Sequence, residues 1–120
     1  MSVEERTPER VDLEIATATG NHAVVRAFLA STCRAWSIDG EVASDCALAV
    51  SEVLAWSGPD RLTISVSRTR GGGTLEVSCA GVHPPEAAEE GDRMRSDLLE
   101  GLTRRIDVGD AGVTLVFSLE

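Results

Sequence analysis

Two carboxylates, Asp45 and Glu52, are candidates for acid–base chemistry because a single apolar helix is expected to carry both. They lie seven residues apart, which corresponds to two turns along one side of a helix. Apolar residues recur at helical spacing through the same stretch, so both acids lie near the edge of a buried face. A carboxylate in that position is costly unless it is hydrogen-bonded or close to solvent. Glu52 therefore needs an explanation from the rest of the chain.

The pair Cys79 and His83 has the residue types of a metal site. A structural zinc ion needs four ligands, and no second pair accompanies this one in the sequence, so we predict no metal. Cys33, Cys46 and Cys79 are odd in number and lie within apolar patterns. We expect them to be buried free thiols of a protein in a reducing compartment.

Composition limits the classes of function that the chain can have. Its 120 residues allow one domain with one modest core, and because only 3% are aromatic, small aliphatic side chains must fill that core. The net charge of −9 argues against a nucleic-acid partner and suits either a basic protein partner or simple solubility. No apolar run approaches the roughly 20 residues of a membrane span, and no leader opens the chain. We expect a cytoplasmic protein that does not contact a membrane.

Hydrophobic periodicity predicts the elements that would position these residues. Residues 1–10 are charged and unpatterned, which predicts a disordered N-terminal tail, and residues 11–120 form a single domain. The expected elements are strand 11–16, helix 22–36, helix 39–58, strands 62–67 and 75–79, helix 95–106, turn 107–112 and strand 113–119. Asn21 and Asp39 are the expected helix caps, and residues 80–92 the expected acidic loop. The order β-α-α-β-β-α-β predicts an α+β two-layer sandwich, in which helices cover one face of a mixed, mostly antiparallel sheet.

That order, with Leu48-Ala49-Val50-Ser51-Glu52 on the second helix, resembles the histidine-kinase-like (Bergerat, or GHKL) ATPase fold. More narrowly, it is similar to the anti-sigma-factor serine kinases of bacterial stress and sporulation pathways. The resemblance covers residues 11 to 120 and includes Arg26 in the first helix and residues 98–108 near the end. It implies a domain that pairs as a dimer and masks a sigma factor, which an anti-anti-sigma (STAS-type) protein then releases.

The second helix of that family carries Glu-x-x-x-Asn, in which the Glu acts near the γ-phosphate and the Asn holds Mg²⁺. Glu52 matches the Glu, but Trp56 occupies the Asn position. An indole offers no oxygen ligand to a hard cation such as magnesium. The resemblance therefore implies that the metal site is lost and that Glu52 is a vestigial carboxylate and not a base.

The family's hairpin ends in Asp-x-Gly-x-Gly, whose Asp accepts a hydrogen bond from adenine. The matching positions here are Cys79, Gly81 and His83, so only Gly81 is retained. A thiol is a poor acceptor, and a site that loses a buried acceptor loses several kcal/mol of specificity.

A Gly-x-Gly before the third helix cradles the phosphates in the family, and those positions fall on Arg93 and Arg95. Both side chains would fill the space that glycine leaves open, although a guanidinium group can bind phosphate by charge. The neighbouring acids Glu89, Glu90 and Asp92 would repel a polyphosphate. We expect Trp56, Cys79 and this segment to close the nucleotide pocket.

These departures predict a regulatory protein-binding module, an anti-sigma-like domain that sequesters a sigma factor or a related partner. ATP and magnesium are disfavoured as cofactors, no catalytic residue is assigned, and Arg26 is the first candidate for a partner contact. Two alternatives stay open. One is an active serine kinase of an anti-anti-sigma protein with divergent nucleotide contacts. The other is a pseudo-ATPase that pairs with an intact paralogue and regulates it.

Overall fold

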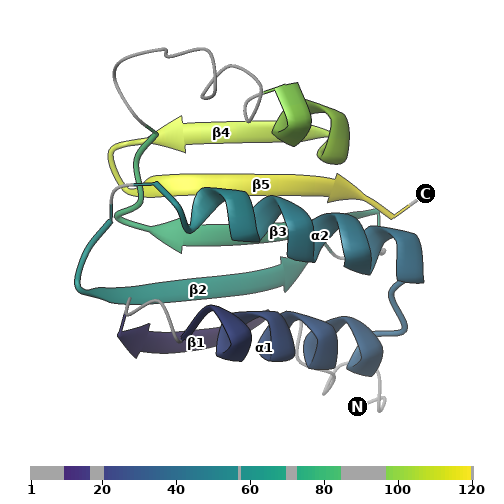
Figure 1. Ribbon diagram of the computed structural model, residues 1–120. Helices are drawn as coiled ribbons and strands as arrows, with labels where there is room; N and C mark the ends of the chain where they lie inside the picture. The colour runs from purple at the N-terminus through teal and green to yellow at the C-terminus, as the bar shows by residue number, and fades with distance from the viewer. Residues whose placement is uncertain (1–9, 17–20, 57, 70–72, 85–96, 120) are drawn as a thin grey trace.

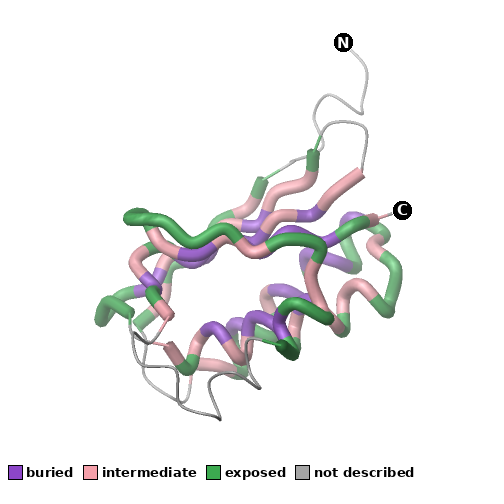
Figure 2. The backbone as a smooth tube through the Cα atoms, turned by 90° about the horizontal axis from the view of Figure 1, so that it is seen from above, coloured by how far each residue is buried: buried purple, intermediate pink, exposed green. Residues whose placement is uncertain are grey.

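The chain folds into two layers, a five-stranded sheet and a layer of helices that lies against one of its faces (Figures 1 and 2). The computed structural model describes residues 10–16, 21–56, 58–69, 73–84 and 97–119. The labelled elements are β1 (Arg10–Ala16), α1 (His22–Ala35), α2 (Gly40–Val53), β2 (Arg61–Arg68), β3 (Thr74–Ala80), β4 (Arg105–Gly109) and β5 (Gly112–Ser118). Residues 97–102 are also helical. This architecture confirms the predicted α+β sandwich, and the predicted order of helices and strands is present with one further strand, β4, before the last.

Helix α1 begins after Asn21, but Asn21 does not cap it with its side chain. The Asn21 amide Nδ2 donates instead to the carbonyl oxygen of Ala16, at 2.6 Å, which ties the start of α1 to the end of β1. The expectation of a side-chain cap was therefore wrong. The apolar face of α1 was predicted correctly, since Val25, Leu29 and Cys33 are all buried.

Helix α2 begins where the sequence predicts, because Asp39 accepts a hydrogen bond from the backbone N–H of Glu41 at 2.8 Å. It ends earlier than expected, at Val53, and not at Gly58-Pro59. The chain leaves the helix through tighter turns, in which the N–H of Trp56 donates to the carbonyl of Val53 at 2.9 Å. Trp56 thus lies beyond the regular helix that carries Glu52.

All four strand pairings are antiparallel, in the order β1-β2-β3-β5-β4. Alternate residues of the central strands point into the helix layer, and the core cluster contains Ile64, Val77 and Leu115, each fully buried. The three helical segments are continuous with this core through residues such as Val50 and Leu99, which are also fully buried. The small aliphatic core that composition predicts is therefore present.

Strand β4 was missed by the sequence analysis. The predicted helix 95–106 and turn 107–112 are corrected here, because helical structure ends at residue 102 and Ile106 lies in β4 opposite Leu115. A tight turn at Asp110 and Ala111 then returns the chain into β5. Gly112 makes this return with a φ of 134°, and a Cβ there would lie 2.2 Å from the carbonyl oxygen of Cys79. Only glycine fits this position.

The predicted tail, residues 1–10, lies outside the described residues except for Arg10, which opens β1. On the sheet, exposed arginines are paired with nearby acids. The three pairs join Arg10 to Asp12 at 3.0 Å, Arg61 to Glu14 at 2.8 Å and Arg105 to Asp107 at 3.0 Å. Exposed pairs of this kind each stabilise a fold by about 1 kcal/mol at most.

Candidate functional site

Glu52 and Trp56, the two candidates from the second helix, occupy different environments. Glu52 is half-buried on the last turn of α2, and Trp56 is half-buried in the turn that follows. Trp56 packs against the hydrophobic core and lines a cavity described below, whereas Glu52 does not line that cavity. The four-residue spacing that the family uses to aim Glu and Asn together is therefore not a helical spacing here.

Cys79, at the position of the adenine-binding Asp, is fully buried in the core on β3. Burial raises the pKa of its thiol to about 12, because the apolar surroundings disfavour the charged thiolate. Cys33 and Cys46 are buried as well, and all three are free thiols, as the sequence predicts. The Cys46 thiol hydrogen-bonds to Cys33, which lowers the pKa of Cys33 and raises that of Cys46.

Gly81, which the family uses to bring backbone close to a nucleotide, has a structural reason to be glycine in this chain. Its φ is 77°, and a Cβ there would lie 3.2 Å from Cδ of Pro59. Its N–H donates to the carbonyl of Ala111 at 2.8 Å, which fixes the turn after β3 to the β4–β5 turn. His83 is exposed two residues further on. Arg93 and Arg95 lie outside the described residues, so the closing of a nucleotide pocket by them stays a prediction.

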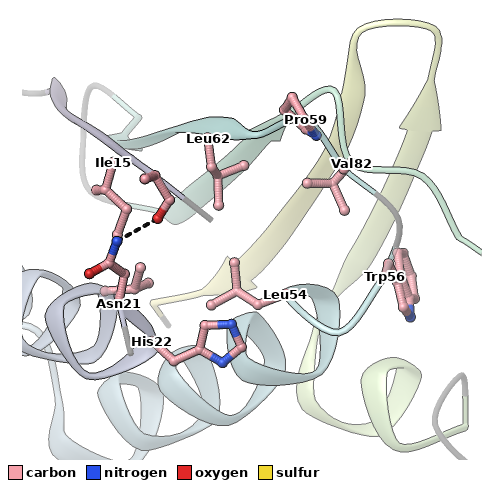
Figure 3. Close-up of a pocket in the computed structure, with 11 residues that line it drawn as sticks. Ile15, Asn21, His22, Leu54, Trp56, Pro59, Leu62 and Val82 are labelled. Atoms are coloured by element: carbon pink, nitrogen blue, oxygen red, sulfur yellow. Dashed lines mark hydrogen bonds between the residues drawn. The ribbon is translucent and has the colours of Figure 1, made fainter. Parts of the chain in front are cut away.

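A cavity of about 180 Å³ lies between the end of β1, the start of α1, the turn after α2 and the segment after β3 (Figure 3). Most of the side chains that line it are apolar, but polar atoms, including those of Asn21 and His22 at the start of α1, make up as much of its exposed wall as apolar atoms do. The lining residues are Ile15, Ala16, Asn21, His22, Val25, Leu54, Trp56, Gly58, Pro59, Leu62 and Val82. Figure 3 shows Leu54, Leu62 and Val82 converging on one space, with His22 beside Leu54.

The cavity is smaller than a pocket that encloses a whole nucleotide. Pockets that enclose drug-sized ligands measure roughly 300–1,000 Å³. A cavity of about 150 Å³ holds benzene, so the space here accommodates one ring with a small substituent. Of the positions that the sequence analysis singled out, Trp56 alone contributes to it.

The helix layer carries a second candidate surface, one for a protein partner. Between His22 and Ala35, α1 contains Arg26 and Arg34, both exposed, and no acidic residue. Between Gly40 and Val53, α2 contains Glu41, Asp45 and Glu52 and no basic residue. Within the described part of the chain, neither arginine forms an ion pair, in contrast to the three paired arginines on the sheet. The helix layer is thus divided into a basic and an acidic half.

Two exposed aliphatic side chains accompany these charges. Val24 on α1 is 48% exposed and Leu48 on α2 is 46% exposed. Exposed apolar side chains on the same helices as exposed charges are typical of a surface that a protein partner covers. The sequence analysis identified Arg26 but missed the division between the two helices, which the absence of acids from one helix and of bases from the other could have revealed.

No pattern in the sequence predicted the cavity. Its residues come from three stretches that are far apart in the sequence, residues 15–25, residues 54–62 and Val82, and no local spacing joins these stretches. Within the part of the chain that the structure describes, every helix falls short of the length and apolarity that membrane crossing requires.

Comparisons with known proteins give a likeness of fold. No protein-family model and no curated protein matches the chain. Among solved structures, it is similar to the crystal structure of the RsbU and RsbW domains of Rv1364c from Mycobacterium tuberculosis. The match has a TM-score of 0.65 at 17% sequence identity, and it covers 93% of this chain and 31% of that one. At this identity the likeness establishes a shared fold and leaves the function to be argued from the residues.

Proposed function

We propose that this chain is a regulatory protein-binding module of the anti-sigma type, which sequesters a sigma factor or related partner without phosphorylating anything. The fold likeness to a structure that contains an RsbW domain agrees with the resemblance seen in the sequence. Because a shared fold does not carry a function, the proposal depends on the helix layer. Its setting would be the bacterial cytoplasm, where sigma factors act.

The division of charge between α1 and α2 is the observation that carries the proposal. Arg26 and Arg34 on α1 offer hydrogen-bond donors to an acidic partner surface, and Glu41 and Asp45 on α2 offer acceptors to a basic one. An unpaired charge on a monomer loses little by being hydrated, and it gains when a partner supplies the opposite charge in a water-poor interface. Val24 and Leu48 supply exposed apolar surface on the same two helices.

The proposal that the chain lacks kinase activity is supported by the residues at the positions where the resembled family binds ATP and magnesium. The Trp56 side chain offers no oxygen ligand to magnesium. The Cys79 side chain is fully buried in the core, where an adenine ring could not reach it. The positive φ of Gly81 belongs to the turn after β3, and its packing against Pro59 leaves little room for a side chain, so this glycine has a structural reason apart from a bound nucleotide. We therefore propose no ATP or magnesium cofactor and no catalytic role for Glu52.

The docking surface can be tested by charge reversal at matched positions. Arg26→Glu and Arg61→Glu change the net charge equally, but Arg26 lies on α1 whereas Arg61 lies at the start of β2. Binding of each variant to the purified sigma factors of the source organism would be measured by biolayer interferometry. We expect Arg26→Glu to weaken binding by about tenfold or more and Arg61→Glu by less than about threefold. Equal losses would show that the helix layer is not the docking surface.

The two alternatives predict different outcomes in solution. Calorimetric titration with Mg-ATP to millimolar concentration should give no binding signal, whereas a micromolar Kd followed by phosphorylation of a STAS-type protein would establish the kinase. A module that regulates an intact paralogue would form a heterodimer with that ATPase and fail to bind any sigma factor. Sedimentation of the purified protein alone and with each candidate distinguishes a homodimer from a heterodimer.

A further inference from the structure

The cavity at the start of α1 has no part in the proposed protein docking. Its deepest walls lie between the two layers, where Val25 of α1, Leu62 of β2 and Val82 after β3 are 1%, 2% and 3% exposed. Side chains so deeply packed keep their positions, so the space is preformed and does not require a partner to shape it. A ligand in this cavity would therefore bind independently of the proposed protein partner.

The two polar side chains of the cavity differ in their hydrogen bonds. The Asn21 Nδ2 already donates to the Ala16 carbonyl, at 2.6 Å. His22 is half-buried at the cavity, and within the described residues its imidazole forms no hydrogen bond. Figure 3 shows the His22 ring beside Leu54, at the side of the cavity opposite Leu62. The imidazole can donate at one nitrogen and accept at the other.

We propose that this cavity binds a monocyclic aromatic compound with one hydrogen-bonding substituent, of the class of phenols and anilines. The ring would lie among Leu54, Leu62 and Val82, and the hydroxyl or amino group would bond to His22. The volume of about 180 Å³ accommodates a ring of this size and is smaller than that of a pocket that encloses a whole nucleotide. The apolar side chains Leu54, Leu62 and Val82 favour a ring, while the polar part of the wall at His22 favours a hydrogen-bonding substituent on that ring.

Phenol and toluene are the probes that test this assignment, because they have nearly the same size and differ in the hydroxyl group. ¹⁵N-labelled protein would be titrated with each and followed by heteronuclear NMR. For a ligand of about seven heavy atoms we expect a Kd of about 0.1–1 mM for phenol, with saturable shifts at the amides of Ile15, His22, Val25, Leu54 and Val82. Toluene should bind about tenfold more weakly, because it cannot form the hydrogen bond to His22.

Val82→Phe fills the cavity, and Val108→Phe adds the same ring at a side chain that is 53% exposed on β4. Phenol binding should be lost in folded Val82→Phe and unchanged in Val108→Phe. Shifts that stay linear to about 10 mM phenol, or that persist in folded Val82→Phe, would overturn the proposal.

His22→Ala keeps the proposal testable if Val82→Phe fails to fold, because His22 is only half-buried. In this variant phenol should lose about tenfold in affinity and bind no better than toluene. Equal binding of phenol and toluene to the unmodified protein, or an unchanged preference in His22→Ala, would overturn the assignment of the polar group to His22 and with it the proposed ligand class.

Discussion

Raising the pH from about 7.5 to about 10.5 should lower the free energy of unfolding, with Cys79 responsible for about 2 kcal/mol of the loss. The buried Cys79 thiol has its pKa raised from a usual value near 9 to about 12. In the unfolded chain the thiol ionises above about pH 9, while in the folded protein it stays protonated. A group whose pKa is raised by folding contributes stability that is present below its unfolded pKa and is lost as the pH rises towards the folded value.

The magnitude follows from the two pKa values. At about pH 10.5 the unfolded thiol is about 1.5 pH units above its pKa, and each unit corresponds to about 1.4 kcal/mol, which gives about 2 kcal/mol. The sequence makes the measurement specific, because it contains no tyrosine and all 11 of its basic residues are arginine. The side chains that titrate in this range are therefore the three cysteines.

The assay is urea unfolding followed by circular dichroism at both pH values, for the unmodified protein and for Cys79→Ala. The variant loses some packing at every pH, but it lacks the ionising thiol, so its stability should fall by about 2 kcal/mol less over the same range. Cys33 and Cys46 are present in both proteins, and their hydrogen bond and burial, the main causes of the raised pKa of Cys46, are the same in both; only the smaller effect of the Cys79 charge on Cys46 differs. Equal losses in the two proteins would refute the placement of Cys79 in an apolar core.

Two further predictions concern the framework that holds the candidate sites. Gly112→Ala should destabilise the protein by more than about 2 kcal/mol and lower its melting temperature sharply, because the added Cβ would lie 2.2 Å from the Cys79 carbonyl oxygen. Gly109→Ala is the matched control, since a Cβ there meets nothing within 4 Å. Asp39→Ala should cost about 1 kcal/mol in urea unfolding, because the Glu41 N–H loses its cap, whereas Asp39→Asn should cost much less. Equal stability of Gly112→Ala and Gly109→Ala, or of the two Asp39 variants, would contradict these assignments.

Much of the fold follows from local spacing in the sequence. Val25 and Leu29 on α1, and Cys46 and Val50 on α2, recur at helical intervals and are buried as predicted. Strands β2 and β3 alternate strictly between buried and less buried residues, which is why their hairpin was found. Such patterns are readable because each element buries one face against the same core.

The missed strand β4 shows where local spacing fails. A helical period fits Leu99, Leu102 and Ile106, and an alternating period fits Ile106 and Val108 equally well. The strand β4 has only five residues, which are too few for the sequence pattern to distinguish a strand from a helix. The structure favours the strand because Ile106 and Val108 pair with Leu115 and Val113 of β5. The pairing partner, β5, follows β4 in the chain, so the residues of β4 alone do not reveal the strand.

The candidate sites were predictable to different degrees. Burial of Cys79 follows from the alternation along β3, and the free thiols follow from their apolar neighbours. Asn21 holds the N-cap position of α1 as predicted, but its side chain does not bond to the helix, because the fold brings the Ala16 carbonyl close enough to accept from it. The cavity could not be predicted, since it exists only where β1, α1 and the turns after α2 and β3 meet.

The central claim, a module that holds its partner without nucleotide, is tested most directly by one binding measurement. The Kd for each purified sigma factor of the source organism would be determined by biolayer interferometry, with and without millimolar Mg-ATP. We predict that at least one sigma factor binds, and that its Kd is the same within twofold in both conditions, because we propose that the chain has no nucleotide site: Trp56 offers no oxygen ligand to magnesium and Cys79 is buried in the core. Binding that requires Mg-ATP, or no binding to any sigma factor, would contradict the account.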